Sequence, residues 1–313
     1  MAELAYLQVA RVCNQQCLFC SNPENGRVIS WEEAVSLVDS FAAQKAVGVI
    51  LTGGEPTLFA RLPELVAYAR KKGLPPRLIT NGQLCAKAGF LRELAAAGLE
   101  HMHVSVHSIK PEVQARLTGN PKSLPNILKT LENAGRAGVR VDINTVINSE
   151  NADHLSLNVR ALAGRFPFVR HFVWNNLDPM MNRASLNPAL VPKLRSFEVE
   201  LHKAMTWLEA AGLTFRVERV PLCFMSEFPH RSTETRKLVK DESREIYFLD
   251  EKGLRRQNKS AWTYEKPPRC RECSLESLCA GLYQMGVYYS PEELCPVFTP
   301  AERVRAAVKG DGS

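Results

Sequence analysis

The sequence predicts an α/β protein, with a partial barrel of six βα units followed by a small cysteine-rich extension. Short apolar runs rich in β-branched residues alternate with amphipathic helical stretches from Leu4 to about Trp174. Gly73, Gly98 and Gly138 each follow a helical stretch, where a left-handed residue ends a helix. Six units are fewer than the eight of a closed barrel, so an open barrel is expected.

The elements can be placed in order along the chain. Strands are expected at Leu4–Val12, Val47–Leu51, Arg77–Thr80, His101–Val106, Val139–Val146 and Val169–Trp174. Helices are expected from Ser30 onward and at Leu62–Lys72, Gly89–Ala97, Ser123–Ala137 and Asp153–Gly164. The first begins in a capping box, Ser30 with Glu33. Successive βα units imply parallel strands, whose carboxyl ends bind ligands in such folds.

The remainder of the chain is less regular. A long helix is expected at about Pro192–Ala211, then a strand at Leu213–Val220. A polar surface loop is expected over Glu227–Asp241, and a strand at Glu245–Leu249 that enters the turn Asp250–Gly253. We therefore expect a barrel domain over residues 1–212 and an extension over 213–313, organised by metal rather than by a large core.

Composition limits the classes of function. The 313 residues are 45% hydrophobic and 23% charged, as in ordinary globular proteins. No apolar run approaches the ~20 residues that span a bilayer, and no secretory signal is present. The chain has nine cysteines, and their metal-ligand spacings then indicate a reducing cytoplasm. The net charge of +7 is spread along the chain, which indicates a solvated basic surface or attraction of an anionic partner, and not nucleic-acid binding.

Three cysteines follow the first strand. Cys13, Cys17 and Cys20 have the spacing Cys-x3-Cys-x2-Cys. Three thiolates on one tight loop can hold three irons of a [4Fe–4S] cube, whereas an electron-transfer cluster has four cysteine ligands. The fourth iron is then open to another ligand. The spacing therefore predicts a catalytic cluster.

The second strand ends in Gly-Gly-Glu-Pro at residues 53–56. Its glycines permit close backbone approach, and its carboxylate can accept hydrogen bonds from an α-ammonium group. Together with the cysteine triad, and with Phe19 directly before Cys20, this segment resembles the signature of the radical S-adenosylmethionine (SAM) enzymes. The resemblance implies a partial (βα)6 radical SAM barrel with a SAM-binding [4Fe–4S] cluster. It also implies reductive cleavage of SAM to a 5′-deoxyadenosyl radical, which abstracts hydrogen from the substrate.

The resemblance further implies which residues bind SAM. Ser105 matches a serine that contacts SAM in relatives, whereas His107 stands where many have an aspartate. Arg116 is either a partner of the SAM carboxylate or an exposed helical arginine. The expected SAM-binding residues are Phe19, Gly53, Gly54, Glu55, Asn81, Ser105, Arg116, Asn144 and Asn175.

Five further cysteines lie near the carboxyl terminus. Cys270, Cys273 and Cys279 have the spacing Cys-x2-Cys-x5-Cys, and Cys223 and Cys295 flank them. Four thiolates suit a structural zinc ion as well as an iron–sulfur cluster. The arrangement resembles the shortened SPASM or twitch extension of radical SAM enzymes, which implies one auxiliary [4Fe–4S] cluster. Its expected ligands are Cys223, Cys270, Cys273 and Cys279, with Cys295 as the alternative to Cys223.

The resemblance favours a peptide maturase that installs a crosslink, an epimerised centre or a backbone rearrangement, including splicease-like excision. A dehydrogenase or mutase acting on a sugar or alcohol is the alternative, and a zinc-stabilised binding protein is a third. The barrel begins within the first four residues, so we expect a separate leader-recognition protein to deliver a precursor peptide. A flavodoxin or ferredoxin is the expected electron donor.

Overall fold

The computed structural model describes residues 4–22, 24–180, 183–241, 245–250, 253–257, 264–284 and 286–310. Its main feature is one nine-stranded sheet with the strand order β7-β6-β5-β4-β3-β2-β1-β8-β9. All neighbouring pairs are parallel except β8 with β9. The strands are β1 (Leu4–Ala10), β2 (Gly48–Gly53), β3 (Pro76–Thr80), β4 (His101–Ser105), β5 (Arg140–Ile147), β6 (His171–Asn176), β7 (Thr214–Glu218), β8 (Glu245–Asp250) and β9 (Gly253–Gln257).

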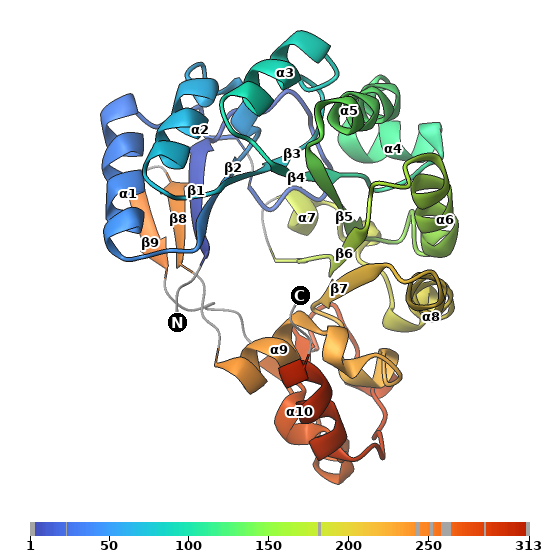
Figure 1. Cartoon of the computed structure of the whole chain (residues 1–313). Coiled ribbons are helices and arrows are strands. Elements are labelled where there is room, and N and C mark those ends of the chain that lie inside the picture. The colour runs from blue at the N-terminus through green and yellow to red at the C-terminus, as the bar shows by residue number, and fades with distance from the viewer. Residues whose placement is uncertain are drawn as a thin grey trace.

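The strands β1–β7 form an open arc with helices along its outer side (Figure 1). These outer helices are α1 (Trp31–Ala43), α2 (Leu62–Lys71), α3 (Ala88–Ala96), α4 (Pro111–Thr118), α5 (Ser123–Ala137), α6 (Leu155–Arg165) and α8 (Leu194–Ala210). The short helix α7 (Arg183–Leu186) follows β6, and α9 (Thr233–Lys240) and α10 (Ala301–Gly310) lie beside β7. The expected open barrel of parallel strands is confirmed.

The helix α5 shows why this layer forms. Its inward residues Leu124, Ile127, Leu131 and Ala134 follow a helical period and are buried. Each large side chain removed from water in this way contributes about 1.5–3 kcal/mol before entropy is counted. The helix ends at Gly138, whose φ of 68° places it in the left-handed region that favours glycine. The α1 capping box between Ser30 and Glu33 is also present.

The two faces of the sheet differ in polarity. In β6 every second residue is fully buried under the helices, and the alternate residues are half-buried on the concave face. The same alternation places Ser105 of β4, Asn144 of β5 and Asn175 of β6 on the concave face near the carboxyl ends of their strands. This edge of the sheet is therefore polar and partly open.

The expected surface loop over Glu227–Asp241 is wrong in part, because residues 233–240 form α9. The helix begins with the Ser232 hydroxyl accepting from Thr235 N at 3.3 Å. Its buried residues are Thr233, Glu234 and Thr235, so its inward face is polar and a hydropathy pattern does not reveal it. The helices α4 and α10 were likewise not anticipated.

The sheet continues past residue 212. Strand β7 pairs with β6, and β8 pairs with β1 at the other side of the arc. The division at 212/213 stays a prediction. Glu251 and Lys252, in the expected turn after β8, lie outside the described residues. In the part of the chain that the structure describes, no helix has the length and apolarity to cross a bilayer.

Candidate functional site

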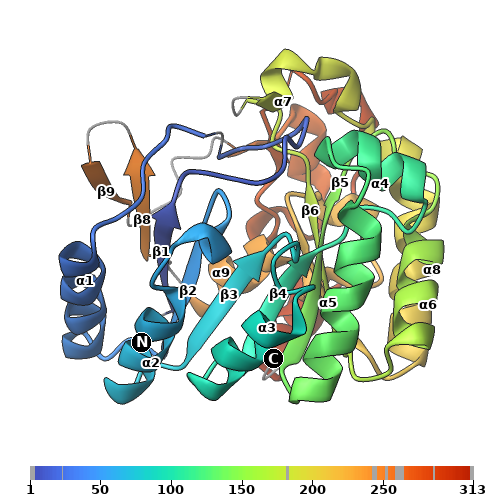
Figure 2. The same cartoon turned by 90° about the horizontal axis from the view of Figure 1, so that it is seen from above.

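The cysteine loop lies across the carboxyl ends of the strands. After β1 the chain extends over this edge of the sheet toward α4 and α7 (Figure 2). Gln16 N donates to Thr118 O at 2.9 Å, and Leu18 N donates to Leu117 O at 3.0 Å. These bonds use carbonyls at the carboxyl end of α4, which have no partner within the helix. The loop is therefore fastened by its backbone between β1 and α4.

The glycines at the end of β2 let the cysteine loop approach the sheet. Gly54 N donates to Ala10 O at 2.6 Å, and Glu55 N donates to Val12 O at 2.9 Å. A Cβ added at Gly53 would overlap Ala10 O, and one at Gly54 would overlap Val12 O. Gly53 also has a φ of 142°, which side chains rarely adopt. The two glycines thus allow the backbone of residues 10–12, just before Cys13, to lie against the end of β2.

The three thiols fit the donor set of an iron–sulfur cluster. Cys13, Cys17 and Cys20 are half-buried and free of disulfides. Burial raises the pKa of the Cys13 thiol to about 11, and burial and the neighbouring thiols raise the pKa of Cys17. Arg183 acts in the opposite direction on the pKa of Cys17 and Cys20. Bound iron strongly favours the thiolate, so neighbouring buried thiols suit a metal cluster.

An apolar cluster covers this loop on one side. Phe19 is 8% exposed and packs edge-on against the ring of His107, with ring centroids 4.7 Å apart. Leu117 of α4 and Leu177 after β6 belong to the same cluster, and Cys17 packs against it. His107 Nδ1 accepts from Val146 N at 3.2 Å, and burial lowers the pKa of its imidazole to about 4. His107 is thus a buried neutral histidine that supports Phe19.

Glu55 is fully buried and accepts four hydrogen bonds. Its Oε1 accepts from Thr57 N at 3.1 Å and from the hydroxyls of Thr57 and Thr80 at 2.6 Å each. Its Oε2 accepts from Asn81 N at 2.8 Å. Burial raises the pKa of this carboxyl group, and these donors act against that shift. The carboxylate joins the ends of β2 and β3.

The structure brings most of the other expected SAM residues to this edge. Asn81 Nδ2 lies 2.7 Å from Asn14 Oδ1 and 3.7 Å from Cys13 Sγ, in contact with the cysteine loop. Asn175 Nδ2 donates to Asn144 Oδ1 at 2.5 Å, and Ser105 is the register partner of Asn144. They form one polar layer on the concave face. Its role in SAM binding stays a prediction.

Arg116 is not brought together with this layer. Its guanidinium pairs with Glu150, and its side chain is 51% exposed on α4. This contact gives Arg116 a partner other than a bound ligand. Its assignment to the SAM carboxylate also stays a prediction.

A second cysteine site lies in the carboxyl-terminal part. Five cysteines, together with Lys266 and Glu276, line one pocket; they are Cys223, Cys270, Cys273, Cys279 and Cys295. Val297 N donates to Cys273 Sγ at 3.3 Å, and Gly281 N donates to Cys279 Sγ at 3.4 Å. Amide donors to sulfur stabilise thiolates and tune iron–sulfur clusters. The donor set fits a metal or cluster.

Cys223 is placed differently from the expectation. It lies in a 3-10 turn, Leu222–Phe224, rather than at the end of β7. Burial raises the pKa of its thiol to about 12, and a backbone hydrogen bond from Cys295 acts against this shift. Cys223 and Cys295 are therefore neighbours, and both remain candidates for the same ligand position.

Two arginines lie near the loop of Cys13, Cys17 and Cys20, and the sequence analysis identified neither of them. Arg183 N donates to Cys20 O at 3.4 Å, and the charge of Arg11 lowers the pKa of the Cys20 thiol. Arg11 stands next to the first strand, where its position could have been noticed. Arg183 lies more than 160 residues away in a segment without a motif, so no sequence signal pointed to it.

The comparisons with known proteins agree with this geometry. Residues 7–160 match the family model of the Radical SAM superfamily. PqqA peptide cyclase of Xanthomonas oryzae pv. oryzae is 32% identical over 196 residues, which cover 58% of this chain and 50% of that protein. Fe-coproporphyrin III synthase of Methanosarcina barkeri is 32% identical over 147 residues, which cover 46% of this chain and 36% of that protein. The chain thus matches half of one curated relative and less of the other.

A solved structure shares the fold over most of the chain. The crystal structure of Streptococcus suis SuiB bound to precursor peptide SuiA has a TM-score of 0.65 and 13% sequence identity. The alignment covers 90% of this chain and 72% of SuiB. The family implies a [4Fe–4S] cluster and SAM, for which the cysteine loop supplies a fitting donor set. Residues 7–160 of this chain are therefore a radical SAM domain.

Proposed function

We propose that this chain cleaves SAM reductively and removes a hydrogen atom from a ribosomally synthesised peptide, which it thereby crosslinks, epimerises or rearranges. The observation that carries the proposal is the cysteine loop, fastened at the carboxyl edge of the sheet next to the polar layer of Ser105, Asn144 and Asn175. The relative named PqqA peptide cyclase and the SuiB structure with its precursor peptide favour a peptide substrate.

In this proposal Cys13, Cys17 and Cys20 hold the cluster, which when bound supplies the electron for cleavage of SAM. The apolar cluster around Phe19 and Leu117 excludes water from one side of the loop. The remaining expected SAM residues at the strand ends orient SAM through hydrogen bonds. A protected site of this kind suits a reaction in which a reactive species must not meet solvent.

We propose that the second cysteine site holds an auxiliary [4Fe–4S] cluster. Cys223, Cys270, Cys273 and Cys279 are the proposed ligands, with Cys295 as the alternative to Cys223. Four thiolates would saturate the cluster, so that it transfers electrons, whereas three would leave one iron open to substrate. The auxiliary site lies in the proposed extension, residues 213–313. Delivery by a leader-recognition protein and reduction by a flavodoxin or ferredoxin stay predictions.

The experiment is an anaerobic assay of the reconstituted protein with SAM and a reductant. Peptides encoded by neighbouring genes are expected to raise 5′-deoxyadenosine formation above the background without peptide, and to change mass or fragmentation. Sugars and alcohols serve as the comparison set. If only small molecules stimulate cleavage, the peptide substrate is wrong and the dehydrogenase or mutase function stands. The relative named Fe-coproporphyrin III synthase favours a small-molecule substrate.

A further inference from the structure

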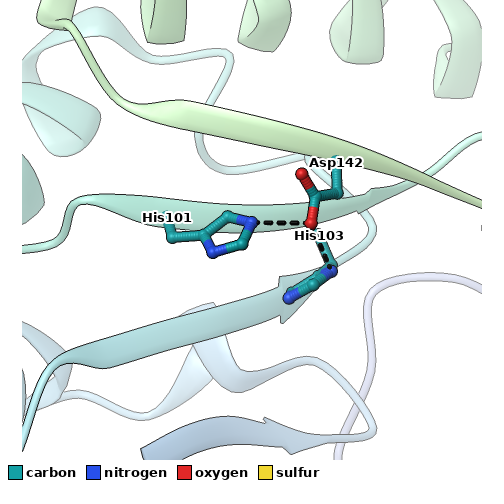
Figure 3. A group of neighbouring side chains, drawn as sticks. All are labelled: His101, His103 and Asp142. Atoms are coloured by element: carbon teal, nitrogen blue, oxygen red, sulfur yellow. Dashed lines mark hydrogen bonds and ion pairs between the residues drawn. The ribbon is translucent and has the colours of Figure 1, made fainter. Parts of the chain in front are cut away.

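Two histidines and an aspartate of neighbouring strands converge on the concave face of the sheet (Figure 3). His101 and His103 belong to β4, and Asp142 belongs to β5. His101 Nε2 lies 2.8 Å from Asp142 Oδ2, and His103 Nδ1 lies 3.6 Å from the same oxygen. One ligand atom from each residue lies within 4.8 Å of the other two. Strand register explains the convergence, because His103 and Asp142 are direct partners.

His103 has no adequate hydrogen bond in this arrangement. Its Nδ1 is too far from Asp142 for one, and its buried Nε2 has no partner among the described residues. Its side chain is only 17% exposed, so bulk water does not compensate fully. Nδ1 is therefore the ring nitrogen that can share an ion with Asp142 and His101. Nε2 is on the other side of the ring, and a buried nitrogen without a partner there indicates a missing water.

The surrounding charges affect what can bind. Asp142 Oδ1 lies 3.4 Å from Arg140 Nε, whose side chain is 64% exposed. His171, the register partner of Asp142, is held through Nδ1 by the Thr214 hydroxyl at 2.7 Å. Arg77, the register partner of His101, and Arg216 on β7 add positive charge to this face. Long-range electrostatics therefore disfavour a weakly coordinated cation such as Mg²⁺, and only direct coordination by good ligands can hold a metal here.

We propose that His101, His103 and Asp142 bind a divalent transition metal, Zn²⁺ or Fe²⁺, on the concave face of the sheet. Two imidazoles and one carboxylate are the ligand set that such ions take when one or more coordination positions stay open. Tetrahedral zinc places its ligand atoms about 3.3 Å apart, so a separation of 2.8 Å between His101 and Asp142 needs only a small adjustment. The site does not depend on the cysteines or on the proposed substrate.

The place of the three ligands in the sheet indicates what lies next to the open coordination position of the metal. Ser105 and Asn144 stand two residues beyond His103 and Asp142 on the same strands and the same face. Two residues of a strand span about 7 Å, so the metal would lie beneath the polar layer next to the cysteine loop. A metal there would hold β4 and β5 in register directly below the proposed SAM and substrate site.

The test uses the full chain after anaerobic reconstitution, so that the cysteine sites are filled before Zn²⁺ is added and excess metal is removed. Zinc content per chain and zinc X-ray absorption are then measured. We expect about one zinc with only nitrogen and oxygen neighbours at about 2.0–2.1 Å, whereas cysteine-bound zinc would show sulfur at about 2.3 Å. The variants His103→Gln and Asp142→Asn are expected to weaken zinc binding at least 10-fold.

The matched control is His171→Gln, which removes a neighbouring histidine of the same face that is not a proposed ligand. It is expected to keep the zinc. Iron and sulfide contents equal to those of the unaltered protein show that each variant folds. Zinc with sulfur neighbours, zinc retained in both ligand variants, or no bound zinc would overturn the proposal; the last result would leave water as the partner of His103.

Discussion

The two cysteine sites are held in place by different means. The loop of Cys13, Cys17 and Cys20 is fastened to β2 and to α4 by backbone hydrogen bonds, and an apolar cluster covers it. The carboxyl-terminal cysteines lie on 3-10 turns and on segments between them, and β10 (Tyr264–Glu265) and β11 (Leu282–Tyr283) are two-residue strands. The first site is therefore held by the sheet, whereas we expect the second to depend on its proposed metal for order.

The largest expected effect is the loss of SAM cleavage when the first cysteine site is altered. Cys17→Ala removes one of three proposed iron ligands and is expected to abolish SAM cleavage. Iron should fall by roughly half, from about eight to about four per chain, because the second site is independent. The control is Cys85→Ala, which removes a buried cysteine from a turn after β3. Loss of all iron in Cys17→Ala would show that the two sites assemble together.

Metal removal should separate the two sites in their backbone order. Under anaerobic chelation, hydrogen exchange is expected to become fast across residues 264–284 and 286–300, where few regular elements protect the amides. The amides of Gln16 and Leu18 should stay protected, because their acceptors belong to α4. Equal loss of protection at both sites would show that the cysteine loop also needs its metal for backbone order.

The stability of the protein should fall when a side chain is added at the end of β2, where the cysteine loop lies against the backbone. Gly54→Ala places a Cβ against Val12 O and is expected to lower the free energy of unfolding by about 3 kcal/mol, at the upper end for overpacking. The control Gly89→Ala has open space around it in α3 and should be neutral or slightly stabilising. Urea unfolding measures both. Similar stabilities for the two variants would mean that the loop is not held against β2.

The same contrast explains how far sequence reasoning reached. The βα alternation predicted β1–β6 and most of the helices that cover them, two later apolar runs predicted β7 and β8, and cysteine spacing indicated both groups of cysteines. The polar inward face of α9 gave no hydropathy signal. The contact between Arg183 and the cysteine loop joins distant parts of the chain, and no motif in the sequence indicates it. His101 and His103 alternate visibly along one strand, but their meeting with Asp142 depends on strand register, which single-strand patterns do not contain.

The smallest of these effects concerns Glu55, for which binding of SAM and support of the loop predict different results. Its two oxygens face the backbone amides of Thr57 and Asn81. In either orientation of a glutamine amide, one of those N–H groups loses its acceptor. We therefore expect Glu55→Gln to lower the free energy of unfolding by about 1–2 kcal/mol without SAM present.

The control for this last variant is Glu64→Gln, which removes an exposed carboxylate paired with Arg61 at 3.6 Å. Exposed pairs of this kind contribute little, so its stability should change by less than about 0.5 kcal/mol. Calorimetric titration with SAM completes the comparison. A Glu55→Gln protein of unchanged stability that no longer binds SAM would assign the carboxylate to the ligand. A destabilised protein that binds SAM normally would assign it to the junction of β2 and β3, and the amino group of SAM would then need another acceptor.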